Sequence, residues 1–386
     1  MASKLSFLFE AVSTAAVSLL RMVGSAAAFA FSALVSSALG PEGAGTFFVS
    51  ITWAFGLAIV ARWGSSDLIL LTLSPLAQGW RREAVPAMLA RYILRSLLRM
   101  LVLVLPGLLA IVWLASSGIA PSLAIDPVFV FFLALAIVVQ QQMSAAAKAF
   151  GRPVLASALE FCFITLFSIA GYFVFRSVMA TAPMRGFELL YLAGAVISTL
   201  ILLFQGANWV SWLRPLRTAA MQTTMRRSHS FAIIELCGYL SVSSSLLLMP
   251  FFLSAADVGI FNAALRIASL VTLVSVSIPS VFVPRLAVAY RLGDMAEARR
   301  LVLSMKLVML VAAIGFFLGV AIFGRMALAL FGAQFAAAYV PLLVTAAGLC
   351  GALALGSGLI DHNQKMTVAA IAMADMKVWA QRSYRV

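Results

Sequence analysis

Residues 127–147 read PVFVFFLALAIVVQQQMSAAA and carry no charged side chain. About 20 consecutive apolar residues are enough for an α-helix to cross the hydrocarbon core of a bilayer. Because backbone groups in lipid must hydrogen-bond within their own segment, such a run predicts a helix rather than a strand. Comparable runs recur at residues 11–39, 46–73, 93–116, 154–175, 187–206, 231–253, 258–288, 301–323 and 335–358. The sequence therefore predicts an all-α fold, a polytopic membrane bundle of about ten transmembrane helices.

The composition excludes an ordinary soluble enzyme. Of the 386 residues, 63% are hydrophobic and 10% are charged, and the mean hydropathy is +1.07. A soluble domain of this size could not remove that much apolar surface from water. The formal charge of +14 is not accompanied by a basic helix, a stacking platform or zinc-ligand spacing, so no nucleic-acid partner is predicted. Three separated cysteines and two isolated histidines predict no disulfide, no metal site and no cofactor.

The distribution of lysine and arginine predicts how the helices are oriented. Counted over the loops on alternate sides, almost all of the basic residues fall on the side that carries the N-terminus. Only Arg176, Arg185 and Arg325 fall on the other side. Cytoplasmic loops carry this excess, so the N-terminus is predicted to be cytoplasmic. The outer loops are short, which disfavours a membrane enzyme such as a polysaccharide polymerase or ligase.

A weak internal repeat divides the chain. Gly45 and Phe47, at the start of the second run, correspond to Gly259 and Phe261 at one offset of 214 residues. Two pseudo-repeated lobes are predicted, and transporters place their substrate sites between such repeats. The expected parts are a six-helix lobe at 1–206, a basic cytoplasmic linker at 207–230, an incomplete second lobe at 231–372 and an aberrant tail at 373–386.

Four stretches carry a family resemblance: GPEGAGTFF at 40–48, ARWGSSD at 61–67, ADVGIFNAALRIASL at 256–270 and VPRLAVAYRLGDMAEARRL at 283–301. Over roughly residues 1–372 the chain resembles the polysaccharide and oligosaccharide flippases of the multidrug/oligosaccharidyl-lipid/polysaccharide exporter superfamily. The resemblance implies that a polyprenyl-diphosphate-linked oligosaccharide crosses a bacterial inner membrane by alternating access. It also implies polysaccharide or lipopolysaccharide biosynthesis, with glycosyltransferases and a polysaccharide polymerase as partners alongside the membrane lipids.

The chain departs from that family at its C-terminal end. Family members have twelve to fourteen helices, whereas the tenth apolar run here ends at Gly358. An eleventh begins near Asn363, and the sequence MKVWAQR at 376–382 does not resemble a span. We therefore expect a C-terminal truncation or a shifted reading frame near residue 373, and an inactive copy is one of the alternatives.

Three arginines within the predicted spans are the candidate substrate contacts: Arg21, Arg62 and Arg266. A charge at the bilayer centre costs about 2.5–3.5 kcal/mol, so it generally faces a cavity or a partner. Helical phase places Arg21 on a polar stripe with Thr14, Ser18 and Ser25, and Arg266 on a second stripe with Asn262 and Ser269. These five polar residues are the candidate cavity-lining residues. The planar guanidinium suits a diphosphate. The plainer interpretation is that the serines pack helices closely, that Arg62 pairs with a carboxylate and that Arg266 reaches the interface.

Three acidic residues are the candidates for ion coupling: Asp67, Glu160 and Glu235. A buried carboxylate can take up a proton or a sodium ion, which would couple transport to a gradient. Arg62 and Asp67 lie about 140° apart on an ideal helix, so they pair only if residues 64–66 unwind. Gln140, Gln141 and Gln142 end the fourth apolar run and are interpreted as an interfacial cap, with contact to a sugar as the alternative.

The leading hypothesis is a lipid-linked oligosaccharide flippase, which is not an enzyme. The alternative within the same superfamily is a cation-coupled multidrug exporter, which predicts an acidic cavity.

Overall fold

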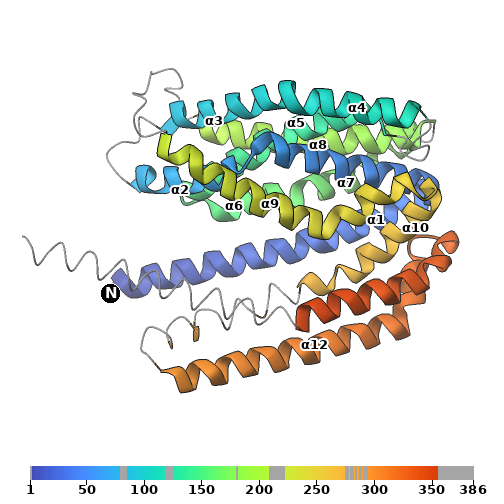
Figure 1. The fold of residues 1–386 in the computed structure, drawn as a ribbon. Helices are drawn as coiled ribbons and strands as arrows, with labels where there is room; N and C mark the ends of the chain where they lie inside the picture. The colour runs from blue at the N-terminus through green and yellow to red at the C-terminus, as the bar shows by residue number, and fades with distance from the viewer. Residues whose placement is uncertain are drawn as a thin grey trace, which may run out of the picture. The chain divides into compact units, whose positions relative to one another are not determined.

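The computed structural model describes residues 2–78, 85–117, 125–179, 181–207, 222–273, 278, 282, 285–286, 289 and 294–354 (Figure 1). Over these ranges the chain forms helices and turns, with no strand. Nine stretches of the same residues are long and apolar enough to cross a membrane. The prediction of an all-α polytopic membrane bundle is confirmed.

The first helix, α1 (Ala2–Arg62), contains two of the predicted spans. Its apolar part, Ala15–Arg62, has 48 residues, which is about 72 Å of straight helix and more than twice the thickness of a hydrocarbon core. Gly40 breaks it with a φ of 69° and Pro41 follows. Figure 1 shows the two segments running in opposite directions from this break. The stretch Ala15–Arg62, counted as one of the nine, therefore contains two spans. With this division the described residues contain the expected ten spans.

Five further spans follow α1. The short α2 (Ser65–Gln78) precedes α3 (Val85–Arg99), the π-helix η2 (Met100–Val104) and α4 (Leu105–Ser116), the last three of which make up one span. Next come α5 (Pro127–Ala149) and the composite span of α6 (Pro153–Ser157), the π-helix η3 (Ala158–Phe163) and α7 (Ile164–Met179). Then come α8 (Pro183–Ala207) and α9 (Gln222–Leu248). The helix α5 begins where the Asp126 side chain accepts hydrogen bonds from the backbone of Val128 and Phe129.

The rest of the described chain is also helical. The 3-10 turn η5 (Met249–Phe251) leads to α10 (Ala255–Ala268), and α12 (Met295–Ala329) is followed by η6 (Ala333–Ala338) and a helix over 339–354. The chain divides into two compact units: residues 1–263 with 330–335, and residues 264–329 with 336–386. Most of the predicted linker 207–230 and all of the tail 373–386 lie outside the described residues, so the predicted domain scheme stays a prediction.

The first unit has an aromatic core. Phe47 is fully buried, and its ring centroid lies 6.2 Å from those of Phe187 and Tyr191. Phe31 stacks on Tyr191 at 5.6 Å, and Tyr172 stacks on Phe187 at 5.2 Å. These rings come from α1, α7 and α8, and their mutual packing fixes the three helices against one another.

In the second unit, α12 packs against the helix that begins at Tyr339. The Tyr339 hydroxyl donates to the backbone oxygen of Ala321 at 2.8 Å, and the Arg325 guanidinium lies 4.8 Å from the Tyr339 ring centroid. A separate core contains Met305, Met309 and Cys350. The second unit is therefore held by its own apolar contacts.

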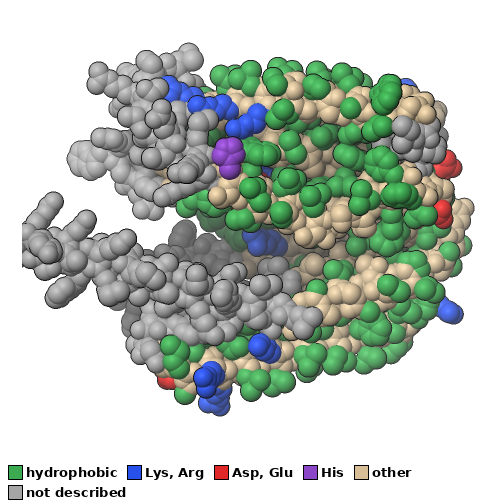
Figure 2. All heavy atoms as spheres, viewed as in Figure 1, with side chains coloured by type: hydrophobic (Ala, Val, Ile, Leu, Met, Phe, Trp, Pro, Cys, Tyr) green, Lys and Arg blue, Asp and Glu red, His purple; other side chains and the backbone are tan. Residues whose placement is uncertain are grey.

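The surface of the helices suits lipid rather than water. Large apolar side chains are widely exposed, including Phe204 at 76% and Val174 at 71%. Figure 2 shows hydrophobic side chains over most of the visible face of the coloured helices. In water such a surface would aggregate, whereas in a bilayer the acyl chains cover it.

Candidate functional site

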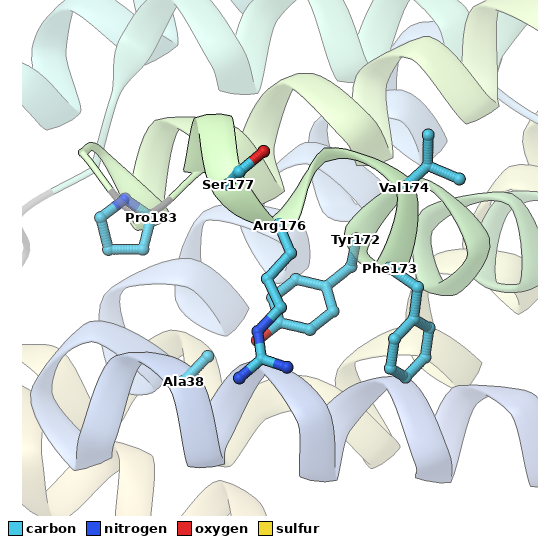
Figure 3. Close-up of a pocket in the computed structure, with 7 residues that line it drawn as sticks. All are labelled: Ala38, Tyr172, Phe173, Val174, Arg176, Ser177 and Pro183. Carbon is cyan, nitrogen blue, oxygen red and sulfur yellow. The ribbon is translucent and has the colours of Figure 1, made fainter.

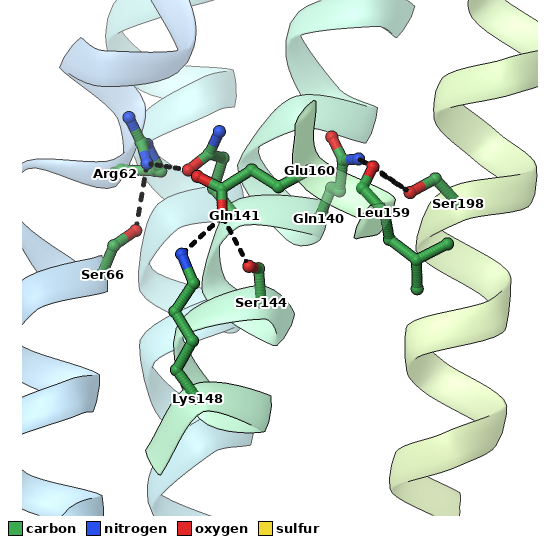
Figure 4. Close-up of polar contacts among 9 residues, drawn as sticks. All are labelled: Arg62, Ser66, Gln140, Gln141, Ser144, Lys148, Leu159, Glu160 and Ser198. Atoms are coloured by element: carbon green, nitrogen blue, oxygen red, sulfur yellow. Dashed lines mark hydrogen bonds and ion pairs between the residues drawn. The ribbon is translucent and has the colours of Figure 1, made fainter. Parts of the chain in front are cut away.

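A buried arginine joins four helices of the first unit. Arg62, the last residue of α1, is 5% exposed and forms an ion pair with Glu235 of α9. Its Nη1 donates to Ser66 Oγ of α2 at 3.1 Å and to Gln141 Oε1 of α5 at 3.2 Å. Figure 4 shows the contacts with Ser66 and Gln141. The sequence left two interpretations of Arg62 open, a substrate contact and a pair with a carboxylate. The structure contains the carboxylate partner, Glu235.

The chain is folded tightly just after Arg62. Trp63 and Gly64 have φ values of 48° and 70°, in the left-handed region, and they end α1 before α2 starts. Ser228 Oγ of α9 donates to the Trp63 backbone oxygen at 2.6 Å, and Trp63 Nε1 donates to His229 Nδ1 at 2.9 Å. The predicted span 46–73 is therefore interrupted at residues 63–64, and α9 is hydrogen-bonded to this turn through Ser228 and His229.

Unwinding of residues 63–64 does not bring Arg62 and Asp67 into a pair. Asp67 is exposed in the first turn of α2, and no described residue forms an ion pair with it. The carboxylate that Arg62 does bind comes from Glu235, 173 residues later in the chain.

The three glutamines of α5 have different hydrogen-bond partners. Gln140 Nε2 donates to the Leu159 backbone oxygen at 2.9 Å and to Ser198 Oγ at 2.7 Å. Gln142 Nε2 lies 2.6 Å from the hydroxyl oxygens of both Ser65 and Ser96. Gln140 and Gln142 are 2% and 0% exposed, so the interpretation of this run as an interfacial cap is wrong. Buried amides of this kind bind helices together within lipid.

Glu160 lies in the π-helix η3 and is paired. Its Oε2 accepts hydrogen bonds from Lys148 Nζ and from Ser144 Oγ, the latter at 2.8 Å, and both partners belong to α5 (Figure 4). The Glu160 side chain is 11% exposed. Single-turn π segments within helices are frequent at functional sites, because they re-aim side chains that a regular helix would place elsewhere.

Arg21 forms no ion pair with any described residue. It is exposed, and its guanidinium carbon lies 5.2 Å from the ring centroid of Phe161, the residue after Glu160. Ser25 Oγ donates to the Arg21 backbone oxygen at 2.9 Å, while Ser18 is half-buried on the same helix. The side chain of Thr14 lies outside the described part.

The candidates on α10 are divided between the two units. Asn262, in the first unit, is fully buried, and neither of its side-chain polar atoms has a hydrogen-bond partner within the described ranges. Arg266, in the second unit, is half-buried in the last turn of α10, and Ser269 Oγ donates to its backbone oxygen at 2.9 Å. The substrate-binding, ion-coupling and cavity-lining assignments of all these residues stay predictions.

Sequence reasoning missed several polar residues of the first unit. Ser66 binds Arg62, and Ser144 and Lys148 bind Glu160, but all three lie near helix ends, where polar residues are common. Glu188 of α8 is only 6% exposed. The sequence feature that could have identified Glu188 is its position as the second residue of the predicted apolar run 187–206. No group of three or more histidine, cysteine, aspartate or glutamate side chains that could hold a metal ion occurs in the searched, described residues.

Solved structures share this helix arrangement. A structure of the inward-facing conformation of a multidrug resistance MATE family transporter of the MOP superfamily matches 91% of this chain and 86% of its own, with a TM-score of 0.66 and 16% identity. At this identity the likeness concerns the fold alone. The outward-facing conformation of such a MATE transporter matches 92% of this chain and 82% of its own, with a TM-score of 0.57 and 14% identity.

A third structure, of a MOP superfamily transporter from Pyrococcus furiosus Vc1, matches 92% of this chain and 84% of its own, with a TM-score of 0.52 and 14% identity. Its structure is described as having a binding pocket of reverse polarity that suggests a different function. A likeness in fold to these transporters therefore does not establish the polarity of a binding site in this chain.

Sequence comparison adds little to this likeness in fold. No family model matches the chain. A putative MucR family transcriptional regulatory protein of Sinorhizobium fredii is 66% identical over 29 residues, which are 8% of this chain and 17% of that protein's length. A stretch this short carries no argument about the fold or activity of the remaining residues.

Proposed function

We propose that this chain is a membrane transporter that exports organic solutes by alternating access, coupled to a proton or sodium gradient. The observation that carries the proposal is the match of its helices to a multidrug MATE transporter over 91% of the chain. In transporters of repeated architecture, the repeats rock against each other around a site near the bilayer midplane. No chemical step is proposed, because moving a solute needs no covalent change.

The paired carboxylates of the first unit support the coupling part of the proposal. Glu160 and Glu235 both lie within spans, and each faces a cation, Lys148 and Arg62 respectively. A carboxylate that exchanges a lysine or arginine partner for a proton or sodium ion changes the charge inside the membrane. Such a change favours one arrangement of the helices over another.

A second function is favoured by Arg21. An exposed guanidinium without a described carboxylate partner suits an anionic substrate, and it disfavours the cationic compounds that an acidic cavity would select. A lipid-linked oligosaccharide with a diphosphate group has that chemistry. In this alternative the diphosphate binds Arg21 while the polyprenyl tail stays in lipid, in a bacterial inner membrane with the N-terminus in the cytoplasm.

The two functions are separated by reconstituting the purified full chain in liposomes. One set of vesicles receives ethidium, a lipophilic cation, under an imposed proton or sodium gradient. The other carries a fluorescent polyprenyl-diphosphate sugar, whose transfer between leaflets is followed by quenching from outside. Gradient-driven ethidium movement is the expected result for the exporter, and Arg21-dependent lipid transfer is the expected result for the flippase. Rates equal to those of protein-free vesicles for both probes would overturn both proposals.

A further inference from the structure

A cavity of about 720 Å³ lies in the first unit, and no residue of the two ion pairs lines it. It is bounded by Ala38 of α1, by Tyr172, Phe173, Arg176 and Ser177 of α7 and by Pro183 of α8 (Figure 3). Glu160 and Arg176 are sixteen residues apart on one composite span, which is about 24 Å of helix. The cavity is therefore near the opposite membrane surface from Glu160, the side that the charge distribution predicts to be outside.

The charged residue that lines the cavity is Arg176, at the end of a span. Arg176 is exposed and is the residue before the last of the span Pro153–Ser177. No described residue forms an ion pair with its guanidinium. Figure 3 shows the side chains of Arg176, Tyr172 and Phe173 extending from α7 toward α1. A guanidinium at this depth lies where the hydrocarbon ends and the phosphates of the lipid headgroups begin.

Exposed phenylalanine side chains lie at and beside the cavity. Phe173 lines the cavity and is 65% exposed, and the neighbouring Phe175 is 52% exposed. The backbone leaves helical geometry at Phe175, with φ −103° and ψ 17°, between the apolar side chains and Arg176. An occupant of this cavity therefore meets the Arg176 guanidinium, the hydroxyl groups of Tyr172 and Ser177, and the ring of Phe173.

We propose that the cavity binds an anionic phospholipid, with the headgroup phosphate on Arg176 and an acyl chain along Phe173. The planar guanidinium donates two parallel hydrogen bonds to phosphate oxygens, and basic pockets between transmembrane helices bind such headgroups. Bound there, the lipid connects the end of α7 with Ala38, two residues before the break of α1 at Gly40. It stabilises the first unit independently of the transported solute.

Native mass spectrometry of the delipidated full chain tests this binding. Phosphatidylglycerol is titrated against phosphatidylcholine of the same acyl chains, and the lipid-bound fraction of the protein is measured. We expect preferential binding of phosphatidylglycerol, and Arg176→Gln should weaken it by about tenfold, because a charge-assisted contact is lost. The matched control is Arg185→Gln, which removes an exposed arginine that does not line the cavity and should leave the preference unchanged.

Further arms separate the alternatives. Arg176→Lys keeps the charge and should retain part of the preference, which distinguishes lost binding from a folding defect. Inorganic phosphate should compete only weakly, since it lacks the acyl chain. Equal binding of the two phospholipids by the unaltered protein, equal effects of the Arg176 and Arg185 changes, or phosphate competing as well as the lipid would each overturn the proposal. Preferential displacement by a polyprenyl diphosphate would overturn the choice of a phospholipid as the occupant.

Discussion

Gly45 and Gly259 face each other in the first unit. Each glycine lies against the backbone of the opposite helix, about one turn before the opposite glycine. A methyl carbon added at Gly45 would lie 2.0 Å from the Ala255 backbone oxygen, and one added at Gly259 would lie 1.9 Å from that of Pro41. Ala255 and Pro41 each lie four residues before the opposite glycine. The two contacts are therefore equivalent under the 214-residue offset of the repeat. Only glycine allows helix backbones to approach this closely.

Gly45→Ala and Gly259→Ala should each destabilise the protein. The added methyl would overlap a backbone oxygen that cannot rotate away, so α1 and α10 must separate, at a cost of at least about 1–3 kcal/mol. Gly107→Ala is the control, because nothing lies within 4 Å of its added methyl. Thermal unfolding in one detergent compares the three variants. Unfolding temperatures of the two tight variants equal to that of the control would show that the close approach does not exist.

Gly64 and Gly151 separate backbone strain from steric overlap. Both have positive φ, 70° and 75°, so alanine at either position costs about 1–2 kcal/mol for the left-handed conformation. At Gly64 the methyl would also lie 2.6 Å from the Ser228 backbone oxygen, whereas at Gly151 it meets open space. Gly64→Ala should therefore lower the unfolding temperature clearly more than Gly151→Ala. Equal shifts would mean that α9 does not press against this turn.

The Arg62 and Glu235 pair should be coupled in stability. Glu235→Ala leaves a buried cation without its carboxylate and should cost about 2–3 kcal/mol, less than the ~3–5 kcal/mol for a fully buried pair, because the Glu235 side chain is 26% exposed. In an Arg62→Met background the same change should cost much less. Asp67→Asn is the control, since Asp67 is exposed. Denaturant unfolding of the four members of the cycle measures the coupling, and additive effects would contradict a direct pair.

The sequence was sufficient for the helices but not for the contacts between them. Long apolar runs predict spans because lipid allows few other structures, and the GPEGAG and ADVGIF segments correctly indicated two equivalent positions. Periodicity gives the face on which Arg62 lies, but not which distant helix covers that face. Its partner Glu235 depends on the packing of α9 against the turn at Trp63 and Gly64.

The polar interior of the first unit was also hidden from sequence reasoning. Gln140 and Gln142 stand near the end of an apolar run, where interfacial residues are expected. Their burial follows from Ser198, Ser65 and Ser96, which belong to other helices and whose hydroxyls face the amides. A single sequence contains the donors and acceptors but not their matching.

Glu160 should be needed for gradient-driven transport more than for folding. Glu160→Gln retains the size of the side chain and an oxygen for Ser144, but it removes the charge that a proton or sodium ion would neutralise. We expect the gradient-driven rate in liposomes to fall at least about tenfold, equivalent to 1.4 kcal/mol or more. The exposed Glu42→Gln is the control and should transport as the unaltered protein does.

The double variant Lys148→Met with Glu160→Gln decides whether that loss is structural. If the single change acts only by leaving Lys148 unpaired within the unit, removing the lysine as well should restore both the unfolding temperature and the transport rate. If Glu160 carries the coupling ion, the double variant should recover stability while transport stays low. An undiminished rate in the single variant would exclude Glu160 from coupling, and the gradient would then have to act through another carboxylate of the spans.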